Sequence, residues 1–210
     1  MSRRTLLVTG GVVAAGGALA YFGREEGGSP FSPRRRRRVE GEVDYRGAVW
    51  VPAADANWRM ADRPHDFTID RVILHVTQGS HATTLKVFRD PAHQAATHYL
   101  VRARDGQVTQ LVREMDVAFH AGHRDFNQRS VGIEHEGWIE RPEGFTEVMY
   151  RSSARLTARV CRRYGIPVDR EHIIGHVEVP DQDHVDPGKD WDWKGYLRMV
   201  NEEYRKLPRS

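Results

Sequence analysis

Two histidines and one aspartate, far apart along the chain, have the residue types and spacing to hold one metal ion. His75 and His176 each lie at the end of a short apolar, β-branched run, so both imidazoles are expected where a buried strand stops. Asp186 comes ten residues after His176; Pro187 favours an extended backbone at Asp186, and Gly188 lets the chain turn away. Two histidines and one carboxylate leave the fourth tetrahedral position open, which is typical of a catalytic zinc site.

The spacing alone leaves a second interpretation open, because no short metal-binding motif joins the two histidines. Histidines that are satisfied within the core or in loops would give the same pattern. The chain has eleven His, a high count, and neutral imidazole is the commonest protein ligand for transition metals. Cys161 is the only cysteine, which excludes an internal disulfide and a multi-thiolate zinc site.

The elements that must position these residues alternate between strands and helices. Strands are predicted over residues 71–76, 97–102, 108–112, 130–136 and 172–175, and helices over 82–88, 146–164 and 193–206. Asp105-Gly106 predicts a hairpin turn between the second and third strands. No Gly-rich phosphate loop is present, so we predict a single α/β domain with a central mixed β-sheet flanked by helices.

Residues 1–22 have the pattern of an export signal. Arg3 and Arg4 precede a weakly apolar stretch from Leu6 to Phe22, which is shorter than the roughly 20 residues that a spanning helix needs. Ala18-Leu19-Ala20 has the small-x-small pattern of a cleavage site. We therefore predict a twin-arginine-like signal, with an uncleaved N-terminal anchor as the alternative. Either one would place the protein outside the cytoplasm, as a secreted, wall-associated or membrane-anchored protein.

Residues 23–45 are predicted to be a disordered basic linker, and residues 46–210 the folded domain. The run Arg34–Arg38 would contact anionic wall polymer or a membrane surface weakly, or serve only as a solvated spacer. Residues 1–40 carry eight Arg and three Glu, whereas residues 41–210 carry 24 basic and 26 acidic residues. The basic charge therefore lies in the tail, and we do not expect the domain to bind nucleic acid.

Five blocks of sequence, in the same order, resemble the zinc-dependent N-acetylmuramoyl-L-alanine amidases of type 2, a superfamily that includes the peptidoglycan recognition proteins. The blocks are Val72–His75, His98–Val101 with Asp105-Gly106, Val117–Gly122, Ser130–Glu134, and Gly175-His176 with Asp186–Gly188. They fall within residues 70 to 193, nearly the whole expected domain. The resemblance implies the fold of that superfamily and one zinc ion per chain, held by His75, His176 and Asp186. It also implies hydrolysis of the amide between N-acetylmuramic acid and L-alanine in peptidoglycan or muropeptides, with zinc-bound water as the nucleophile.

The resemblance assigns catalytic roles to two further residues. Glu134 corresponds to a strand glutamate that faces the metal and would act as general base and acid; the alternative is a solvent-facing strand carboxylate. Glu136 has the same side-chain parity but lies further along the strand. His184 stands where some members carry a lysine and would donate a hydrogen bond or charge to the oxyanion, unless it is a surface loop histidine.

Four residues are candidates for contacting the substrate. His120 and Asn127 resemble a ligand-contacting pair near the mouth of the cleft, and Phe119 stands where tryptophan is usual. His98 is grouped with them, although orienting the site from behind or packing in the core fits it equally. Thr97 occupies a position where related amidases often have tyrosine, so no tyrosine would share the role of Glu134.

Two other functions compete with this interpretation. The first is a peptidoglycan-binding module without hydrolysis, which the complete set of ligands argues against. The second is a different zinc amide hydrolase that cuts within the stem peptide, but the sequence has no H-E-x-x-H motif. We expect the protein to be a monomer.

Overall fold

The computed structural model describes residue 39 and residues 41–208. The signal predicted over residues 1–22 and most of the linker predicted over 23–45 lie outside this part of the chain. Among the helices in this described part of the chain, none is long and apolar enough to cross a membrane.

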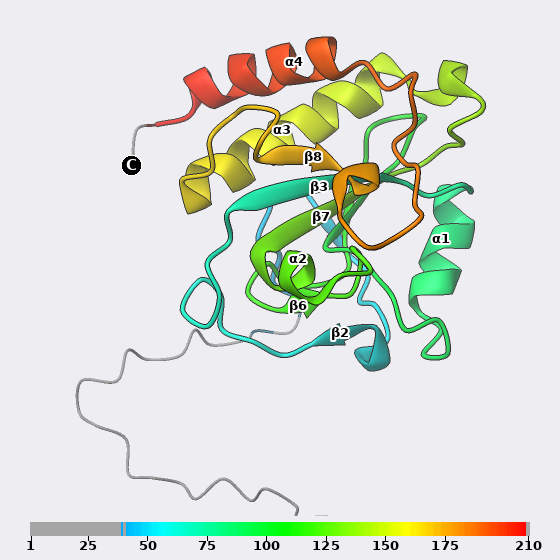
Figure 1. Ribbon diagram of the computed structural model, residues 1–210, viewed down its shortest axis with the longest axis vertical. Helices are drawn as coiled ribbons and strands as arrows, with labels where there is room; N and C mark the ends of the chain where they lie inside the picture. The colour runs from blue at the N-terminus through cyan, green and yellow to red at the C-terminus, as the bar shows by residue number, and fades with distance from the viewer. Residues whose placement is uncertain (1–38, 40, 209–210) are drawn as a thin grey trace, which may run out of the picture. The chain divides into compact units, whose positions relative to one another are not determined.

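Six strands form a mixed central sheet in the order β1-β5-β4-β7-β3-β8. Figure 1 shows its labelled strands β7, β3 and β8 next to one another. Their bounds are β1 Val49–Trp50, β3 Arg71–Val76, β4 Tyr99–Val101, β5 Val108–Gln110, β7 Ser130–His135 and β8 Ile173–Gly175. β4 and β5 are antiparallel, and all other neighbours are parallel. Two short strands, β2 (Trp58–Arg59) and β6 (Val117–Ala118), form a separate antiparallel pair. The predicted α/β class with a mixed sheet is confirmed.

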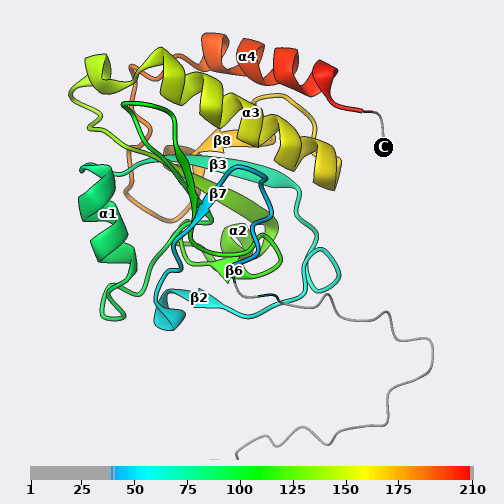
Figure 2. The same ribbon diagram turned by 180° about the vertical axis from the view of Figure 1, so that it is seen from behind.

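Two long helices pack side by side over one face of the sheet, as both views show (Figures 1 and 2). These are α3 (Glu147–Tyr164) and α4 (Trp193–Lys206). The shorter helices α1 (His81–Phe88) and α2 (Arg124–Arg129) pack against side chains of the opposite face. Three single turns of 3₁₀ helix are η1 (Asp55–Asn57), η2 (Pro142–Gly144) and η3 (His176–Glu178).

Helix α3 begins and ends where its sequence predicts. The Thr146 hydroxyl accepts a hydrogen bond from the Met149 backbone N–H at 3.3 Å and so caps the first turn. Gly165 ends the helix in the left-handed conformation at φ +69°, which glycine adopts without steric cost. Leu156 and Val160 lie on the buried stripe between these ends, facing the sheet and α4.

Side-chain alternation along β3 and β7 assigns their residues to two faces. On β3, Leu74 packs in the core beneath α3 and α4, whereas Ile73 packs on the opposite face with residues near α2. His75 therefore shares the face of Ile73. On β7, Ile133 lies in the α3/α4 core, which turns Glu134 to the other face, and the parallel register pairs Glu134 with His75. The sheet thus presents the metal-ligand candidate and the base candidate side by side.

The folded domain begins before the predicted boundary at residue 46. The Asp44 carboxylate accepts hydrogen bonds from Gln110 Nε2 at 2.6 Å and from the Glu114 backbone N–H at 2.9 Å. Tyr45 packs against the main core. The prediction of a disordered linker is therefore wrong at its last residues. The hydrogen-bond partners of Asp44 lie more than 60 residues away along the chain, so the local sequence does not reveal them.

Candidate metal centre

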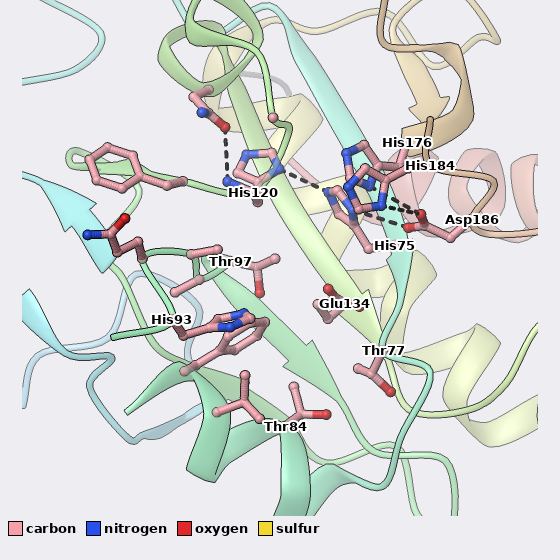
Figure 3. Close-up of a pocket in the computed structure, with 18 of the residues that line it drawn as sticks. His75, Thr77, Thr84, His93, Thr97, His120, Glu134, His176, His184 and Asp186 are labelled. Atoms are coloured by element: carbon pink, nitrogen blue, oxygen red, sulfur yellow. Dashed lines mark hydrogen bonds and ion pairs between the residues drawn. The ribbon is translucent and has the colours of Figure 1, made fainter. Parts of the chain in front are cut away.

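A cavity of about 1000 Å³ opens on the sheet face opposite α3 and α4. Figure 3 shows His75, His176 and Asp186 together on one side of it, with Thr84, His93 and Thr97 on the opposite wall. Of the residues that the sequence analysis singled out, the cavity is lined by His75, Phe119, His120, Asn127, Glu134, His176, His184 and Asp186. Eight of the nine predicted site residues thus share one cavity.

The three predicted metal ligands converge, and all three are buried. Each offers one ligand atom, and these atoms lie within 4.8 Å of one another. His75 Nδ1 lies 3.3 Å from Asp186 Oδ2, and His176 Nδ1 lies 3.1 Å from Asp186 Oδ1. One carboxylate therefore stands between two imidazole nitrogens that come from neighbouring strand ends.

Hydrogen bonds from backbone N–H groups hold the loop that carries Asp186 against the strand ends. The Val177 N–H donates to the Asp186 carbonyl at 2.9 Å, and the Val76 N–H donates to the Asp186 carboxylate at 3.3 Å. Gly188 turns the chain at φ +89°, and a Cβ there would lie 2.9 Å from Ile139. The return of this loop to the histidines, which the Pro-Gly pair predicts, is what the structure shows.

A chain of hydrogen bonds determines which nitrogen of His75 carries the proton. The Ser130 hydroxyl donates to the Phe126 carbonyl at 2.5 Å, so it accepts from His120 Nε2 at 3.1 Å. His120 Nδ1 then has no proton and accepts from His75 Nε2 at 2.9 Å. A neutral His75 consequently presents the lone pair of Nδ1 to Asp186, and an imidazole oriented by such a partner is typical of metal ligands.

These donors fit a divalent cation such as zinc. The His75 Nδ1 lone pair and the Asp186 carboxylate are both acceptors that face each other, and a cation would satisfy both. His176 Nε2 is buried without a hydrogen-bond partner among residues 41–208. Burial lowers the pKa of His75, which keeps the ring neutral and able to bind a metal. Burial opposes ionisation of Asp186, but the hydrogen bond from His176 Nδ1 and the nearby His75 ring outweigh it and hold the pKa of the carboxyl well below its usual range.

Glu134 points into the cavity with one carboxylate oxygen unpaired. Oε2 is buried and has no hydrogen-bond partner in the described part of the chain. Burial raises the pKa of Glu134 well above its usual range, and the nearby Asp186 charge adds to the effect. Glu136 differs, because its carboxylate accepts from the backbone N–H groups of His81 and Ala103, both at 2.8 Å. Glu134 is therefore available for proton transfer, whereas Glu136 links the start of α1 and the segment after β4 to the end of β7.

His184 lies over the metal-ligand candidates at the mouth of the cavity. Its ring stacks on His176 with the ring centroids 3.9 Å apart, and its Nδ1 lies 3.7 Å from Asp186 Oδ1. The side chain is 54% exposed. It is therefore accessible to a ligand in the cavity and close to the candidate ion-binding atoms.

Of the four substrate-contact candidates, three line the cavity and one does not. Asn127 Oδ1 accepts from the backbone N–H groups of His120 and Ala121 at 2.9 and 2.7 Å, and this fixes the loop that carries His120. His98 is fully buried: its Nδ1 accepts from the Gly132 N–H at 3.0 Å, and Nε2 lies 2.7 Å from an Arg63 nitrogen. The prediction that His98 contacts the substrate is therefore wrong, because its ring packs behind the cavity wall.

The sequence analysis missed the role of His120 toward His75 and the place of His93 in the cavity wall. It placed His120 with the substrate-contacting residues but did not identify it as the hydrogen-bond partner of His75. It left His93 without a role, yet His93 lines the cavity with its ring 6.0 Å from that of Phe88. The strand before His120 is only two residues long, so no local pattern marked His120 or His93.

Gly132 makes room for the His120 ring, and this gives a testable prediction. A Cβ at position 132 would lie 2.6 Å from His120 Cγ and Nδ1. We expect Gly132→Ala to lower the free energy of unfolding by about 1–3 kcal/mol, as overpacking does, and to weaken zinc binding because His120 moves from His75. Urea unfolding and zinc titration measure both effects. Gly144→Ala is the matched control, since a Cβ there meets nothing within 4 Å. Equal stability of the two variants would contradict this role of Gly132.

Comparison with known proteins agrees with this geometry. Residues 65–189 match the family described as N-acetylmuramoyl-L-alanine amidase. N-acetylmuramoyl-L-alanine amidase A of Achromobacter lyticus is 33% identical over an alignment of 176 residues, and the match covers 76% of this chain and 96% of that protein. The 1,6-anhydro-N-acetylmuramyl-L-alanine amidase AmpD of Haemophilus influenzae is 34% identical over an alignment of 113 residues, and that match covers 51% of this chain and 59% of that protein.

Two solved structures are similar in fold. The crystal structure of an AmpD derivative matches with a TM-score of 0.62 at 23% identity, over 79% of this chain and 99% of that one. The amidase AmiD from E. coli, solved with the substrate anhydro-N-acetylmuramic acid-L-Ala-D-gamma-Glu-L-Lys, matches with a TM-score of 0.55 at 25% identity. That match covers 63% of this chain and 57% of AmiD.

Proposed function

The chain belongs to the N-acetylmuramoyl-L-alanine amidase family and is a peptidoglycan amidase of that class, and we propose that it works with one zinc ion held by His75, His176 and Asp186. The observation that carries the proposal is the meeting of these three buried donors beside the unpaired carboxylate oxygen of Glu134 in one cavity. When bound, zinc lowers the pKa of a water molecule from ~15.7 to about 7 and polarises a carbonyl as a Lewis acid. An amide is a poor electrophile, so both effects are needed.

Glu134 is proposed to move the proton. It would accept a proton from the attacking water and return it to the departing amine of L-alanine. Its raised pKa supports this role, because a carboxyl that titrates closer to neutrality both accepts and releases a proton readily. Thr97 also lines the cavity, but its hydroxyl donates a hydrogen bond to the Tyr99 carbonyl at 2.9 Å, so it does not compete for this role.

His184 is proposed to stabilise the negative charge that develops on the amide oxygen. It lines the cavity and stacks on His176, so a group bound there would lie within its reach. An imidazole N–H donates a hydrogen bond to such an oxygen whether or not the ring is charged.

Replacement of His184 by alanine tests this assignment. We expect His184→Ala to keep its zinc and to lower kcat about 100-fold, the lower end for the loss of one oxyanion donor. The measurement is the initial rate of peptide release from peptidoglycan, with zinc content checked in the same preparation. An unchanged rate in zinc-loaded His184→Ala would contradict a role for His184.

The cavity has the size and lining for a muropeptide. Its volume of about 1000 Å³ lies at the upper end of small-molecule sites, which run from about 300 to 1,000 Å³. Phe119 offers an apolar surface for a sugar or peptide, and Asn127 and His120 lie beside it. The complexes of AmiD and of AmpDh3 from Pseudomonas aeruginosa with anhydromuramic peptides support a substrate of this kind.

Export is proposed on the sequence pattern of residues 1–22, with the basic run Arg34–Arg38 as a weak contact to anionic wall polymer or membrane. A substrate in the cell wall supports that location. The folded domain itself is proposed to act as a monomer, because every predicted catalytic and ligand residue comes from one chain.

Digestion of purified peptidoglycan separates this proposal from its rivals. The full chain is incubated with intact sacculi, with and without a chelator, and the soluble products are identified by mass spectrometry. We expect free stem peptides that begin at L-alanine, released only when metal is present. Products cut within the stem would indicate a peptidase, and binding to sacculi without any release would indicate a non-catalytic module.

A further inference from the structure

A series of buried polar side chains connects the two long helices to the backbone of a metal-ligand candidate. His135, the last residue of β7, has its Nδ1 2.8 Å from the His75 carbonyl oxygen and its Nε2 2.6 Å from Ser153 Oγ on α3. Ser153 Oγ lies 2.8 Å from the Tyr196 hydroxyl on α4, which lies 2.7 Å from Thr157 Oγ1. The side chains of this series are fully buried.

The direction of every hydrogen bond in this series follows from the His75 carbonyl at one end of it. A carbonyl oxygen only accepts, so His135 Nδ1 carries the proton and donates to His75. The neutral ring then accepts at Nε2 from the Ser153 hydroxyl. Ser153 in turn accepts from Tyr196, and Tyr196 from Thr157. One arrangement of protons therefore satisfies all members, and a fully satisfied buried network restrains the orientation of its groups.

His135 also touches the loop that carries the third ligand candidate. Its ring lies 4.7 Å from that of Trp191, five residues after Asp186, with an interplanar angle of 60°. The backbone carbonyl of His135 accepts from the N–H of Thr77, the residue directly after β3, at 3.0 Å. His135 thus contacts the strand of one ligand and packs against the loop of another, from the face of the sheet that lies away from the cavity.

Packing alone does not explain a histidine at this position. Neighbouring side chains that face α3 and α4 from the same strands, such as Leu74 and Ile133, are apolar. Burial of a polar side chain costs free energy unless its hydrogen bonds are made, so an apolar residue would fill this space at lower cost. What the imidazole adds is a donor aimed at the His75 carbonyl and an acceptor aimed at α3.

We propose that His135 is a positioning residue of the metal centre, which holds the His75 backbone and the Asp186 loop in register with helices α3 and α4. The proposal rests on the proposed function, because it takes His75, His176 and Asp186 as the metal ligands. It adds a residue outside the cavity that would set metal affinity without touching the metal or the substrate.

Zinc affinity of the full chain is the measurement that tests this role. His135→Leu removes the donor to His75 and the acceptor for Ser153, and we expect zinc to bind about tenfold more weakly, the lower end for loss of outer partners of metal ligands. Ser153→Ala removes only the support of the ring, and we expect a smaller loss in the same direction. Affinity is measured by competition with a chromophoric chelator, and the visible spectrum of the cobalt(II)-loaded protein reports the ligand arrangement.

Ser152→Ala is the matched control, because Ser152 is the neighbouring residue on α3 and its hydroxyl accepts from Arg155 instead. We expect this variant to keep wild-type zinc affinity and cobalt spectrum. In the double variant, Ser153→Ala should cause no further loss once His135 is leucine, since the two residues act through one hydrogen bond. If His135→Leu does not fold, the comparison of Ser153→Ala with Ser152→Ala decides.

The outcomes separate this inference from the proposed function. Weaker zinc binding and a shifted cobalt spectrum in Ser153→Ala, with neither change in Ser152→Ala, would support the positioning role. Wild-type zinc affinity and spectrum in Ser153→Ala, and in His135→Leu where it folds, would overturn it and leave the metal centre intact. A wild-type protein that binds no zinc would overturn the metal centre, and this inference with it.

Discussion

Replacement of Glu134 by glutamine is expected to leave a folded, zinc-binding protein that releases stem peptides at least about 100-fold more slowly. General acid–base catalysis contributes typically 10²–10⁴-fold, and glutamine keeps the size of the side chain but neither accepts nor returns the proton. Glu134 is not among the three converging donors, so zinc content should remain near one ion per chain. The measurement is kcat for peptide release together with zinc content, from the same preparation.

Glu136→Gln is the matched control for this experiment. Glu136 lies two residues further along the chain, directly after β7, and its carboxylate accepts hydrogen bonds from the backbone N–H groups of His81 and Ala103, outside the proposed chemistry. We expect this variant to be less stable, because glutamine retains a single acceptor oxygen, but to keep its turnover when folded. An active Glu134→Gln, or an inactive but folded and zinc-loaded Glu136→Gln, would contradict the assignment of the base.

Replacement of Asp186 by alanine is expected to abolish both zinc binding and hydrolysis. Asp186 supplies the only carboxylate of the three ligand candidates, and its oxygens face both His75 Nδ1 and His176 Nδ1. Without it the site loses the negative charge that balances a divalent ion. Zinc content after dialysis, measured by mass spectrometry, should fall from about one ion per chain to near zero, and peptide release should fall to background.

Asp190→Ala controls for a change of charge in the same loop. Its carboxylate pairs with the exposed Lys189 at 2.8 Å, and such surface pairs contribute about 0–1 kcal/mol. This variant should keep its zinc and its activity. Full zinc content in Asp186→Ala would show that the ion is held elsewhere.

Most of the positions of the site could be predicted because they lie at the ends of strongly patterned strands. The apolar run before His75 predicts a buried strand, and side-chain parity along β7 places Glu134 on the face opposite Ile133. Pro187 and Gly188 mark the return of the loop to His176. In each case local composition and spacing carry the information, and the sheet register does the rest.

Other features depend on contacts that no local pattern records. The strands β1, β2 and β6 are two residues long and exist through pairing with other strands, so neither alternation nor β-branched composition identifies them. His98 and His120 look alike in sequence, each beside a short strand. Arg63, 35 residues earlier, contacts the ring of His98 behind the wall, whereas His120 faces His75. Tertiary partners, rather than residue type, decided their roles.

His135 shows the same limit from the other side. Its parity predicts that it faces away from Glu134 and into the core, where a charged or unpaired imidazole would be costly. Only the packing of α3 and α4 reveals that Ser153 and the His75 carbonyl satisfy both ring nitrogens. A polar residue at a core position of a predicted strand is therefore worth testing for a buried network.

The central claim is that His75, His176 and Asp186 hold one divalent ion, and a crystal structure of the zinc-loaded protein tests it most directly. Anomalous diffraction on either side of the zinc edge locates the ion without reference to the protein chemistry. We predict one strong peak per chain in contact with His75 Nδ1, an imidazole nitrogen of His176 and the Asp186 carboxylate, at about 2.0–2.2 Å from each. A peak elsewhere in the chain, or no peak in protein that releases stem peptides from peptidoglycan, would contradict the claim.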